Sequence, residues 1–172
     1  MSDDAQTVVV LLTLVALLCL LLTPFLLFFV YVFFQNSKRK RIRERMLAAH
    51  QELIRDHKPI PVRYCSEARF KAWLKIFPWE GAGVLLPSLG NIVFLGEKLS
   101  GAPVTLQFAP TNSEIKWLGK CPWPNGAVSW FEVDRPGERH YFTSETGAFV
   151  FGSHKSTRAA YDQAQNSFTS LA

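Results

Sequence analysis

The chain has 172 residues, of which 48% are hydrophobic and 19% are charged, and its formal net charge is +5. This length allows one compact domain with an appendage and argues against a multidomain enzyme. The composition is that of a folded protein rather than a disordered or low-complexity chain. The averages hide three regions: an apolar N-terminal stretch, a basic segment, and a remainder that is rich in Trp and Phe.

An uncharged run of 27 residues, Val8–Phe34, predicts a transmembrane helix. A helix of this length reaches roughly 40 Å, which exceeds the ~30 Å hydrocarbon core of a bilayer. Pro24 lacks a backbone donor and is expected to kink the helix in mid-span. A cleaved signal peptide fits poorly, because it would begin with basic residues and this chain begins with Ser2, Asp3 and Asp4.

The charges on the two sides of the run predict its orientation. Positive residues close to a span remain on the cytoplasmic side, and six follow this one: Lys38, Arg39, Lys40, Arg41, Arg43 and Arg45. We therefore expect a single-pass protein of the plasma membrane or bacterial inner membrane, with the N-terminus outside and the C-terminal domain in the cytoplasm. The six side chains are expected to contact anionic headgroups of the bilayer. Nucleic acid is not expected as a partner, because the basic run adjoins the bilayer and no nucleic-acid-binding motif follows it.

The chain is thereby divided into a short extracytoplasmic tail (1–7), a transmembrane helix (8–34), a basic juxtamembrane helix (35–58) and a soluble domain (59–172). In the juxtamembrane helix, apolar side chains recur at spacings of four and three: Ile42, Met46, Ala49 and Leu53. This narrow stripe predicts either packing against the soluble domain or a homodimer seam. His50 and His57 lie on the same side but lack further ligands, so we interpret them as surface residues.

The cysteines do not suggest a metal or cofactor site. Cys19 lies in the span, and Cys65 and Cys121 are isolated in the sequence. None of the spacings that bind zinc or haem is present. A disulfide between Cys65 and Cys121 would require a domain outside the cytoplasm, against the predicted orientation.

A second helix is predicted over residues 66–77. Ser66 is suited to cap it, and Pro78 ends it. Its apolar side chains have helical spacing: Phe70, Trp73, Leu74 and Phe77. This face is expected either to pack on the sheet or, together with neighbouring basic residues, to contact the membrane interface. Phe70, Trp73 and Phe77 are the candidate interfacial residues.

Seven short runs after Gly83 have the composition of β-strands. They are separated by turn signals rich in Pro, Gly and Asn, and such short connections require mostly antiparallel neighbours. A final helix is predicted to begin at Ser156. The runs are 84–86, 91–95, 104–108, 114–118, 127–133, 140–143 and 149–151.

Seven antiparallel strands followed by a C-terminal helix resemble the pleckstrin-homology (PH) superfold, most closely GRAM and bacterial PH-like domains. The resemblance covers about residues 78–170, and depends on element order, on the opening strand–turn–strand Gly83–Phe94 and on the segment Tyr141–Phe151 before the last helix. It implies a binding domain. Members that bind phosphoinositides carry basic residues around the first strand–turn–strand, whereas Val84–Phe94 has none. The resemblance therefore implies a protein partner more than an inositide.

The five Trp residues all fall between positions 73 and 130. Two or three are expected to fill the interior of the domain. Trp123 lies between Pro122 and Pro124 in a segment that is unsuited to a strand. We expect it either to contact a partner or to cover one end of the sheet.

No catalytic motif was found. His140 and His154, with Glu132, Asp134, Glu138 and Glu145, are the available acids and bases, and their spacing on strands and turns predicts solvated side chains rather than an active site. The sequence therefore favours a membrane-anchored, non-enzymatic binding or adaptor module that recruits an unknown protein partner. The alternative is an accessory or assembly subunit of a larger membrane complex.

Overall fold

The computed structural model describes residues 3–52, 58–75, 77–88, 91–121, 125–146 and 153–171. The chain forms two compact units, Met1–Ser37 and Lys38–Ala172. The second unit begins within the basic segment, so this segment belongs to the same compact unit as the sheet. The sequence pattern had placed the start of the soluble domain at residue 59.

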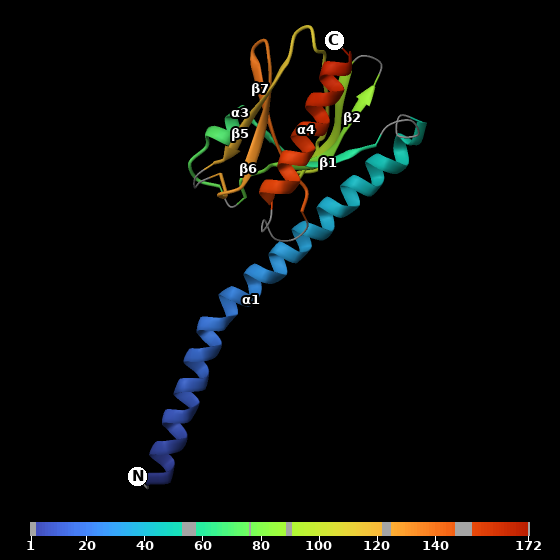
Figure 1. The fold of residues 1–172 in the computed structure, drawn as a ribbon. Coiled ribbons are helices and arrows are strands. Elements are labelled where there is room, and N and C mark those ends of the chain that lie inside the picture. Colours follow the sequence, from blue (N-terminus) through green and yellow to red (C-terminus); the bar gives the residue numbers. More distant parts are fainter. Residues whose placement is uncertain are drawn as a thin grey trace. The chain divides into compact units, whose positions relative to one another are not determined.

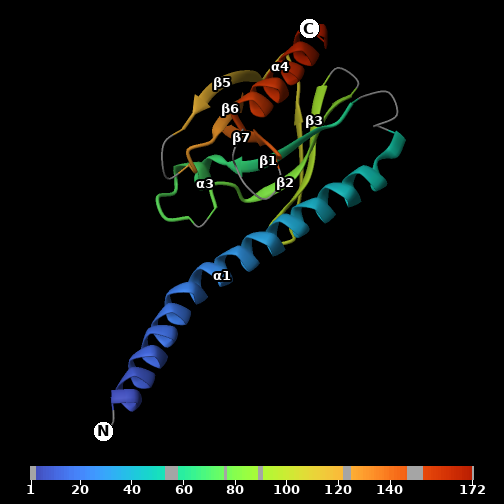
Figure 2. The ribbon, with the colours of Figure 1, turned by 60° about the horizontal axis from the view of Figure 1, so that its bottom comes forward.

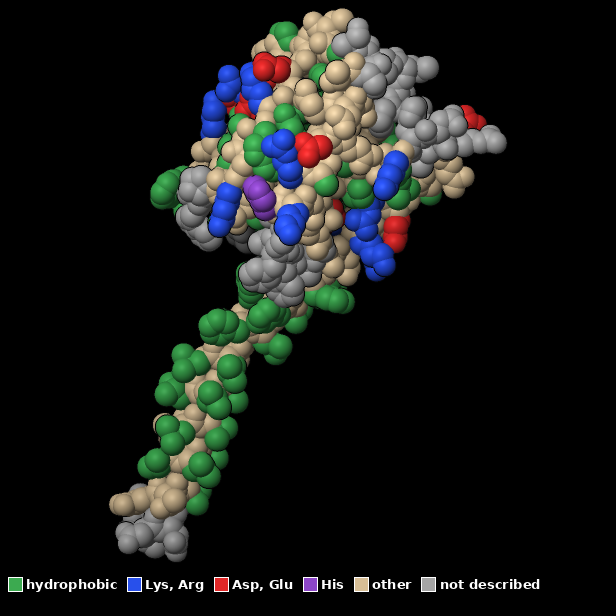
Figure 3. Space-filling model, viewed as in Figure 1, with side chains coloured by type: hydrophobic (Ala, Val, Ile, Leu, Met, Phe, Trp, Pro, Cys, Tyr) green, Lys and Arg blue, Asp and Glu red, His purple; other side chains and the backbone are tan. Residues whose placement is uncertain are grey.

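Helix α1, Asp3–Ala49, runs through the first unit and into the second. Apolar side chains cover the visible surface of its first part (Figure 3), and the most exposed of them is Leu20. The hydroxyl groups of Thr13 and Thr23 donate to the carbonyl oxygens of Val9 and Cys19, so these polar groups are satisfied within the helix. The helix is long and apolar enough to cross a membrane, as judged by length and composition.

The second unit is built on one curled, fully antiparallel sheet (Figure 1). Its order is β4-β3-β2-β1-β7-β6-β5, so β4 and β5 are the edge strands. Gly83 lies opposite Gly96 across β2 and β3, and a Cβ on Gly83 would meet the carbonyl oxygen of Leu95 at 2.2 Å. The strands are β1 (Ile60–Ser66), β2 (Gly81–Ser88), β3 (Asn91–Lys98), β4 (Pro103–Phe108), β5 (Glu114–Lys120), β6 (Ser129–Arg135) and β7 (Glu138–Ser144).

The concave face of the sheet forms the main core together with helix α4, Ser153–Leu171. Side chains alternate along a strand, so Val62 and Tyr64 of β1 point inward with Phe94 and Phe142 from other strands. Helix α4 contributes a single apolar face: Ala160, Ala164 and Phe168. The predicted fold class, an N-terminal apolar helix followed by a seven-stranded antiparallel domain with a C-terminal helix, is confirmed.

The opposite face of the sheet is covered by two segments of the chain. The last part of α1 lies across β2 and β3, on the other side of the sheet from α4 (Figure 2). Residues 67–80, which include the short helix α3 (Glu67–Lys71), cover β1, β7 and β6. The sheet is therefore packed on both faces.

Two expected elements differ from the structure. The first strand is Ile60–Ser66, a segment in which Pro61 and Arg63 obscured the strand pattern, while the expected strand at 149–151 lies outside the described residues. The hairpin that the resemblance placed first is thus β2–β3. The helix expected over 66–77 ends at Lys71, because Ala72 has an extended backbone; the Ala72 N–H donates to the carbonyl oxygen of Arg69, and Lys75 Nζ donates to the carbonyl oxygens of Arg69 and Phe70.

Candidate membrane-proximal surface

The juxtamembrane part of α1 packs on the domain through an apolar stripe. Ile42 is fully buried, and Met46 and Leu47 pack against a cluster formed by Val84, Leu86 and Leu95. Of the two alternatives for the stripe, packing against the domain is therefore the one observed for Ile42 and Met46. Ala49 is exposed, which corrects its place in the stripe, and Leu53 and His57 lie outside the described residues.

Arg39 is buried where the two covering segments meet. Only 2% of Arg39 is exposed, and its Nε donates to Glu145 Oε2 at 3.2 Å. The other oxygen of this carboxylate accepts from Arg63 Nη2 at 2.8 Å. Both guanidinium groups lie over the indole of Trp79, Arg63 at 4.1 Å and Arg39 at 5.4 Å from the ring centroid. Burial lowers the pKa of Arg39, and the charge of Glu145 opposes this shift. The first turn of the docked helix is thus held by a buried, charge-assisted contact.

Some of the other basic side chains of the segment contact the domain, and others extend into solvent. Lys38 Nζ donates to the carbonyl oxygen of Leu99, and Arg45 lies 3.1 Å from Glu97. Lys40 is exposed and pairs loosely with Glu44 at 3.8 Å. Arg41 is exposed and Arg43 is half-buried, and neither forms an ion pair within the described part of the chain. Of the six predicted headgroup contacts, Lys40, Arg41 and Arg45 are thus exposed, and Arg45 is at the same time paired with Glu97.

The predicted interfacial residues separate into two groups. The ring of Phe70 stacks on Tyr141, with centroids 3.9 Å apart and planes 6° apart, and Phe77 stacks on Trp79. Phe70 and Phe77 are therefore packed within the domain. Trp73 is 75% exposed, and its neighbour Leu74 is 87% exposed. These two residues, which we call the apolar tip, are the part of the predicted apolar face that reaches solvent.

Lys75 braces the segment that carries the apolar tip. Its Nζ donates to the carbonyl oxygens of Arg69 at 3.0 Å and Phe70 at 2.9 Å, and also to Asn125 Oδ1. Arg69 Nη2 donates to the carbonyl oxygen of Phe77 at 3.2 Å. Desolvation lowers the pKa of Lys75. The connection between β1 and β2 thus does contain basic residues, but two of them, Arg69 and Lys75, donate hydrogen bonds to carbonyl oxygens of the same loop.

The Trp residues are placed mainly in the interior. Trp130 is fully buried and donates from Nε1 to the carbonyl oxygen of Asn125 at 3.1 Å. Trp79 is also buried, and Trp117 is partly buried against the main core. The expectation that two or three Trp residues fill the domain is confirmed. Trp123, the predicted partner contact, lies outside the described residues.

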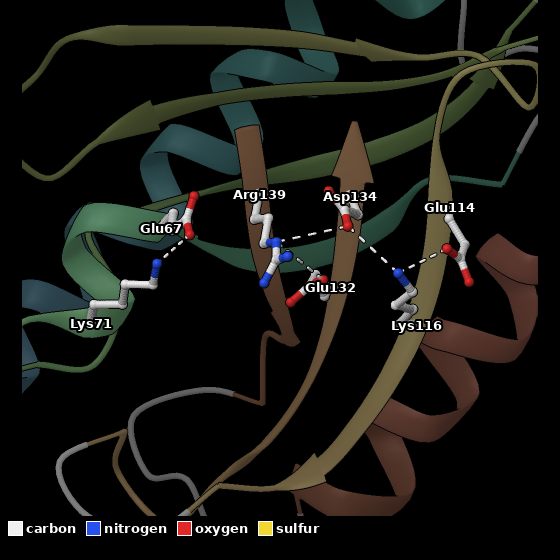
Figure 4. Close-up of polar contacts among 7 residues, drawn as sticks. All are labelled: Glu67, Lys71, Glu114, Lys116, Glu132, Asp134 and Arg139. Atoms are coloured by element: carbon white, nitrogen blue, oxygen red, sulfur yellow. Dashed lines mark hydrogen bonds and ion pairs between the residues drawn. The ribbon is translucent and has the colours of Figure 1, made fainter. Parts of the chain in front are cut away.

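Acidic and basic side chains alternate across the outer face of β5, β6 and β7 (Figure 4). Arg139 Nε lies 3.7 Å from Asp134 and 4.0 Å from Glu132. Lys116 Nζ lies 2.8 Å from Glu114 and 3.5 Å from Asp134. Glu132 and Asp134, two of the acids considered from the sequence, are therefore engaged in cross-strand ion pairs.

Two histidines contact hydroxyl groups. His140 is buried, with Nδ1 3.3 Å from the Tyr64 hydroxyl and Nε2 3.3 Å from Glu138. Burial lowers the pKa of His140 and raises that of Tyr64. The Ser129 hydroxyl lies 2.8 Å from His154 Nδ1, but among the described residues no carboxylate contacts His154. Among the described residues the Ser129–His154 pair thus lacks the carboxylate of a Ser-His-Asp triad, and the Tyr64–His140 pair is buried.

The remaining sites offer little to a small ligand. Pro110–Glu114 and Asp134–Gly137 line a shallow, open hollow. In the part of the chain that the structure describes, no group of three His, Cys, Asp or Glu residues is arranged to hold a metal ion. Cys65 and Cys121 are free thiols, and burial raises the pKa of Cys65 to about 12.

No protein-family model matches the chain, and neither a curated protein nor a solved structure is significantly similar to it. The candidate surface is therefore defined by its own geometry. It consists of the docked basic helix, the buried contact of Arg39 with Glu145, and the braced apolar tip.

Proposed function

We propose that this protein is a membrane-anchored, non-enzymatic adaptor whose domain recruits a protein partner at the cytoplasmic face of a membrane. The observation that carries the proposal is the contact between Arg39 and Glu145. Arg39 follows the apolar unit by two residues and is already buried in the domain. A binding domain joined to its anchor without a long linker stays close to the bilayer surface.

The proposed orientation follows from the charges around the apolar run. Six basic residues lie within eleven positions of its proposed cytoplasmic end, at 38–45, whereas Asp3 and Asp4 precede it. The rule for positive residues counts charges near the span during insertion, so the later burial of Arg39 does not weaken it. We propose a single-pass protein of the plasma membrane or bacterial inner membrane.

We also propose that the domain is PH-like. Support comes from the seven antiparallel strands, in which β1 pairs with both β2 and β7, from the curl of the sheet and from the helix that covers its concave face. The resemblance to a PH domain was expected over about residues 78–170. Because the first strand of the sheet is β1, Ile60–Ser66, the proposed PH-like domain extends over residues 60–171. Such folds host many binding functions, so the partner is inferred from surfaces and not from the fold.

An anchor exchange tests the function against its alternative, an accessory subunit of a membrane complex. The full chain and a variant whose residues 8–34 are replaced by an unrelated span are cross-linked in native membranes. After extraction in mild detergent, the cross-linked chains are identified. An adaptor retains its partner in both forms, since the domain makes the contact. Loss of the same partner on anchor exchange would instead indicate a subunit whose span packs against other spans.

A further inference from the structure

We propose that the apolar tip, Trp73 and Leu74, inserts into the interfacial region of the bilayer and gives the domain a second membrane contact. The proposal rests on the membrane anchor of the proposed function. It adds that the domain is held at the surface in one orientation, with the tip toward the lipid.

The tip differs from the rest of the domain in exposure. Among the described residues of Lys38–Ala172, the large hydrophobic side chains with high exposure are Leu74 at 87%, Trp73 at 75% and Leu118 at 40%. The other large apolar side chains of the sheet and of α4 are at least partly buried. Two adjacent, almost fully exposed apolar side chains are therefore a local feature of this loop and not a general property of the surface.

The tip is presented on a rigid base. Phe70 on one side is stacked on Tyr141, and Phe77 on the other side is stacked on Trp79. Lys75, immediately after the tip, donates to two carbonyl oxygens and to Asn125. Because the base is packed and hydrogen-bonded, little conformational entropy remains to be lost when the tip inserts.

The loop that carries the tip lies near the first residues of the domain, Lys38 and Arg39. Lys38, the first residue of this unit, donates to the carbonyl oxygen of Leu99. Leu99 and Phe77 pack against the same cluster, which contains Trp79. Arg39 in turn lies 5.4 Å from the centre of the Trp79 ring. The loop that carries the tip is thus in direct contact with Arg39, and is linked to Lys38 through Leu99.

The chemistry of the tip suits a bilayer interface. Trp is favoured at the level of the headgroups, where its ring is partly apolar and its N–H finds polar partners, and Leu adds apolar area below it. Lys71, two residues before Trp73, is exposed and forms an ion pair with Glu67 at 2.5 Å, so these two residues together add no net charge beside the tip. Lys40 and Arg41 add exposed charges on the docked helix.

Site-directed spin labelling of the full chain in vesicles tests the proposal. Cys19, Cys65 and Cys121 are replaced by Ala, and one nitroxide is attached to Leu74→Cys in vesicles of phosphatidylcholine with a third of phosphatidylglycerol. Leu20→Cys reports on the span. Thr111→Cys is the control, because it lies far from the tip. Thr111 comes shortly after Phe108, which pairs with Ile92 at the start of β3, whereas Leu99 follows the other end of this strand.

Collision rates with apolar oxygen and with a water-soluble nickel complex give the depth of each label. We expect the Leu20 label in the hydrocarbon core, the Leu74 label at or just below the phosphates, and the Thr111 label in water. A Leu74 label in water, with Leu20 in lipid, would overturn this inference and leave the anchor intact. A Leu74 label shielded from both reagents would also overturn it, because a protein surface would then cover the tip. A Leu20 label in water would instead refute the anchor itself.

Discussion

The carboxylate of Glu145 is shared between two buried guanidinium groups, and the one from Arg39 approaches it at 3.2 Å. Arg63 contacts the other oxygen at 2.8 Å. The residues that meet here are far apart in the sequence: Arg39 follows the apolar unit, Arg63 lies on β1, and Glu145 follows β7. The contact therefore joins the juxtamembrane helix to the centre of the sheet.

Substitutions of the residues in this contact are expected to lower the free energy of unfolding by different amounts. Glu145→Gln leaves two buried cations without their carboxylate and is expected to lower the free energy of unfolding by about 3–5 kcal/mol. Arg39→Met leaves Glu145 paired with Arg63 and is expected to cost only about 1–2 kcal/mol. Arg41→Met, at an exposed position, is the control and should stay within about 0.5 kcal/mol. Urea unfolding of residues 38–172 measures all three, and a larger loss for Arg39→Met than for Glu145→Gln would contradict the assignment.

The docked helix is expected to be part of the folding unit. Residues 38–172 should give a cooperative thermal transition. In residues 59–172, removal of the helix exposes Val84, Leu86 and Leu95, and re-exposing each buried aliphatic side chain costs about 1.5 kcal/mol or more. The shorter protein should therefore melt at a lower temperature and bind the dye ANS. Equal melting temperatures for the two proteins would show that the helix does not stabilise the domain.

The fold could be predicted from the sequence where apolar runs were long or regularly spaced. The apolar run at 8–34 and the strands from Gly81 onward had clear patterns, and so did the final helix. Strand β1 did not, because Pro61 and Arg63 interrupt its apolar residues and Arg63 is buried against Glu145 and Trp79. Local patterns carry no information about such distant partners.

The contacts within the candidate surface could not be predicted from the sequence. The basic run was recognised, yet all six cations looked equivalent in the sequence. Whether each cation is buried or exposed depends on partners that are distant in the chain; the partner of Arg39, for example, is Glu145, 106 positions away. Likewise, helical spacing placed Phe70, Trp73 and Phe77 on one face, whereas in the structure, where α3 ends at Lys71, the two Phe rings stack on other aromatic side chains and Trp73 is exposed.

The stability of the domain is expected to fall in mild acid because of His140. Its pKa is lowered by burial, so the folded chain resists protonation while the unfolded chain takes up a proton near the ordinary pKa of about 6.5. The contribution of neutral His140 is thus present above pH 6.5 and is lost as the pH falls toward the folded pKa. Unfolding free energies between pH 5 and 7.5 should show this slope, and His140→Gln should remove it. An unchanged slope in the variant would assign the acid sensitivity to other groups.

Binding of residues 38–172 to anionic vesicles should depend on the exposed cations. Each Lys or Arg near an anionic surface contributes about 1 kcal/mol, so Arg41→Gln should weaken binding roughly fivefold at low salt, and less as salt rises. Lys155→Gln removes the same charge from an exposed position on α4 and is the control. Flotation or tryptophan fluorescence titration measures both variants. Equal losses for the two would mean that net charge alone, and not the docked helix, drives the attraction.

The most direct test of a membrane-anchored cytoplasmic module is the topology of the full chain in intact cells. With the native cysteines replaced, single cysteines at Ser2 and at the exposed Thr111 are exposed to a membrane-impermeant thiol reagent before and after lysis. The account predicts that Ser2→Cys reacts in intact cells and that Thr111→Cys reacts only after lysis, while the protein remains in the membrane fraction after an alkaline wash. Labelling of Thr111→Cys in intact cells, or release of the protein by the wash, would contradict it.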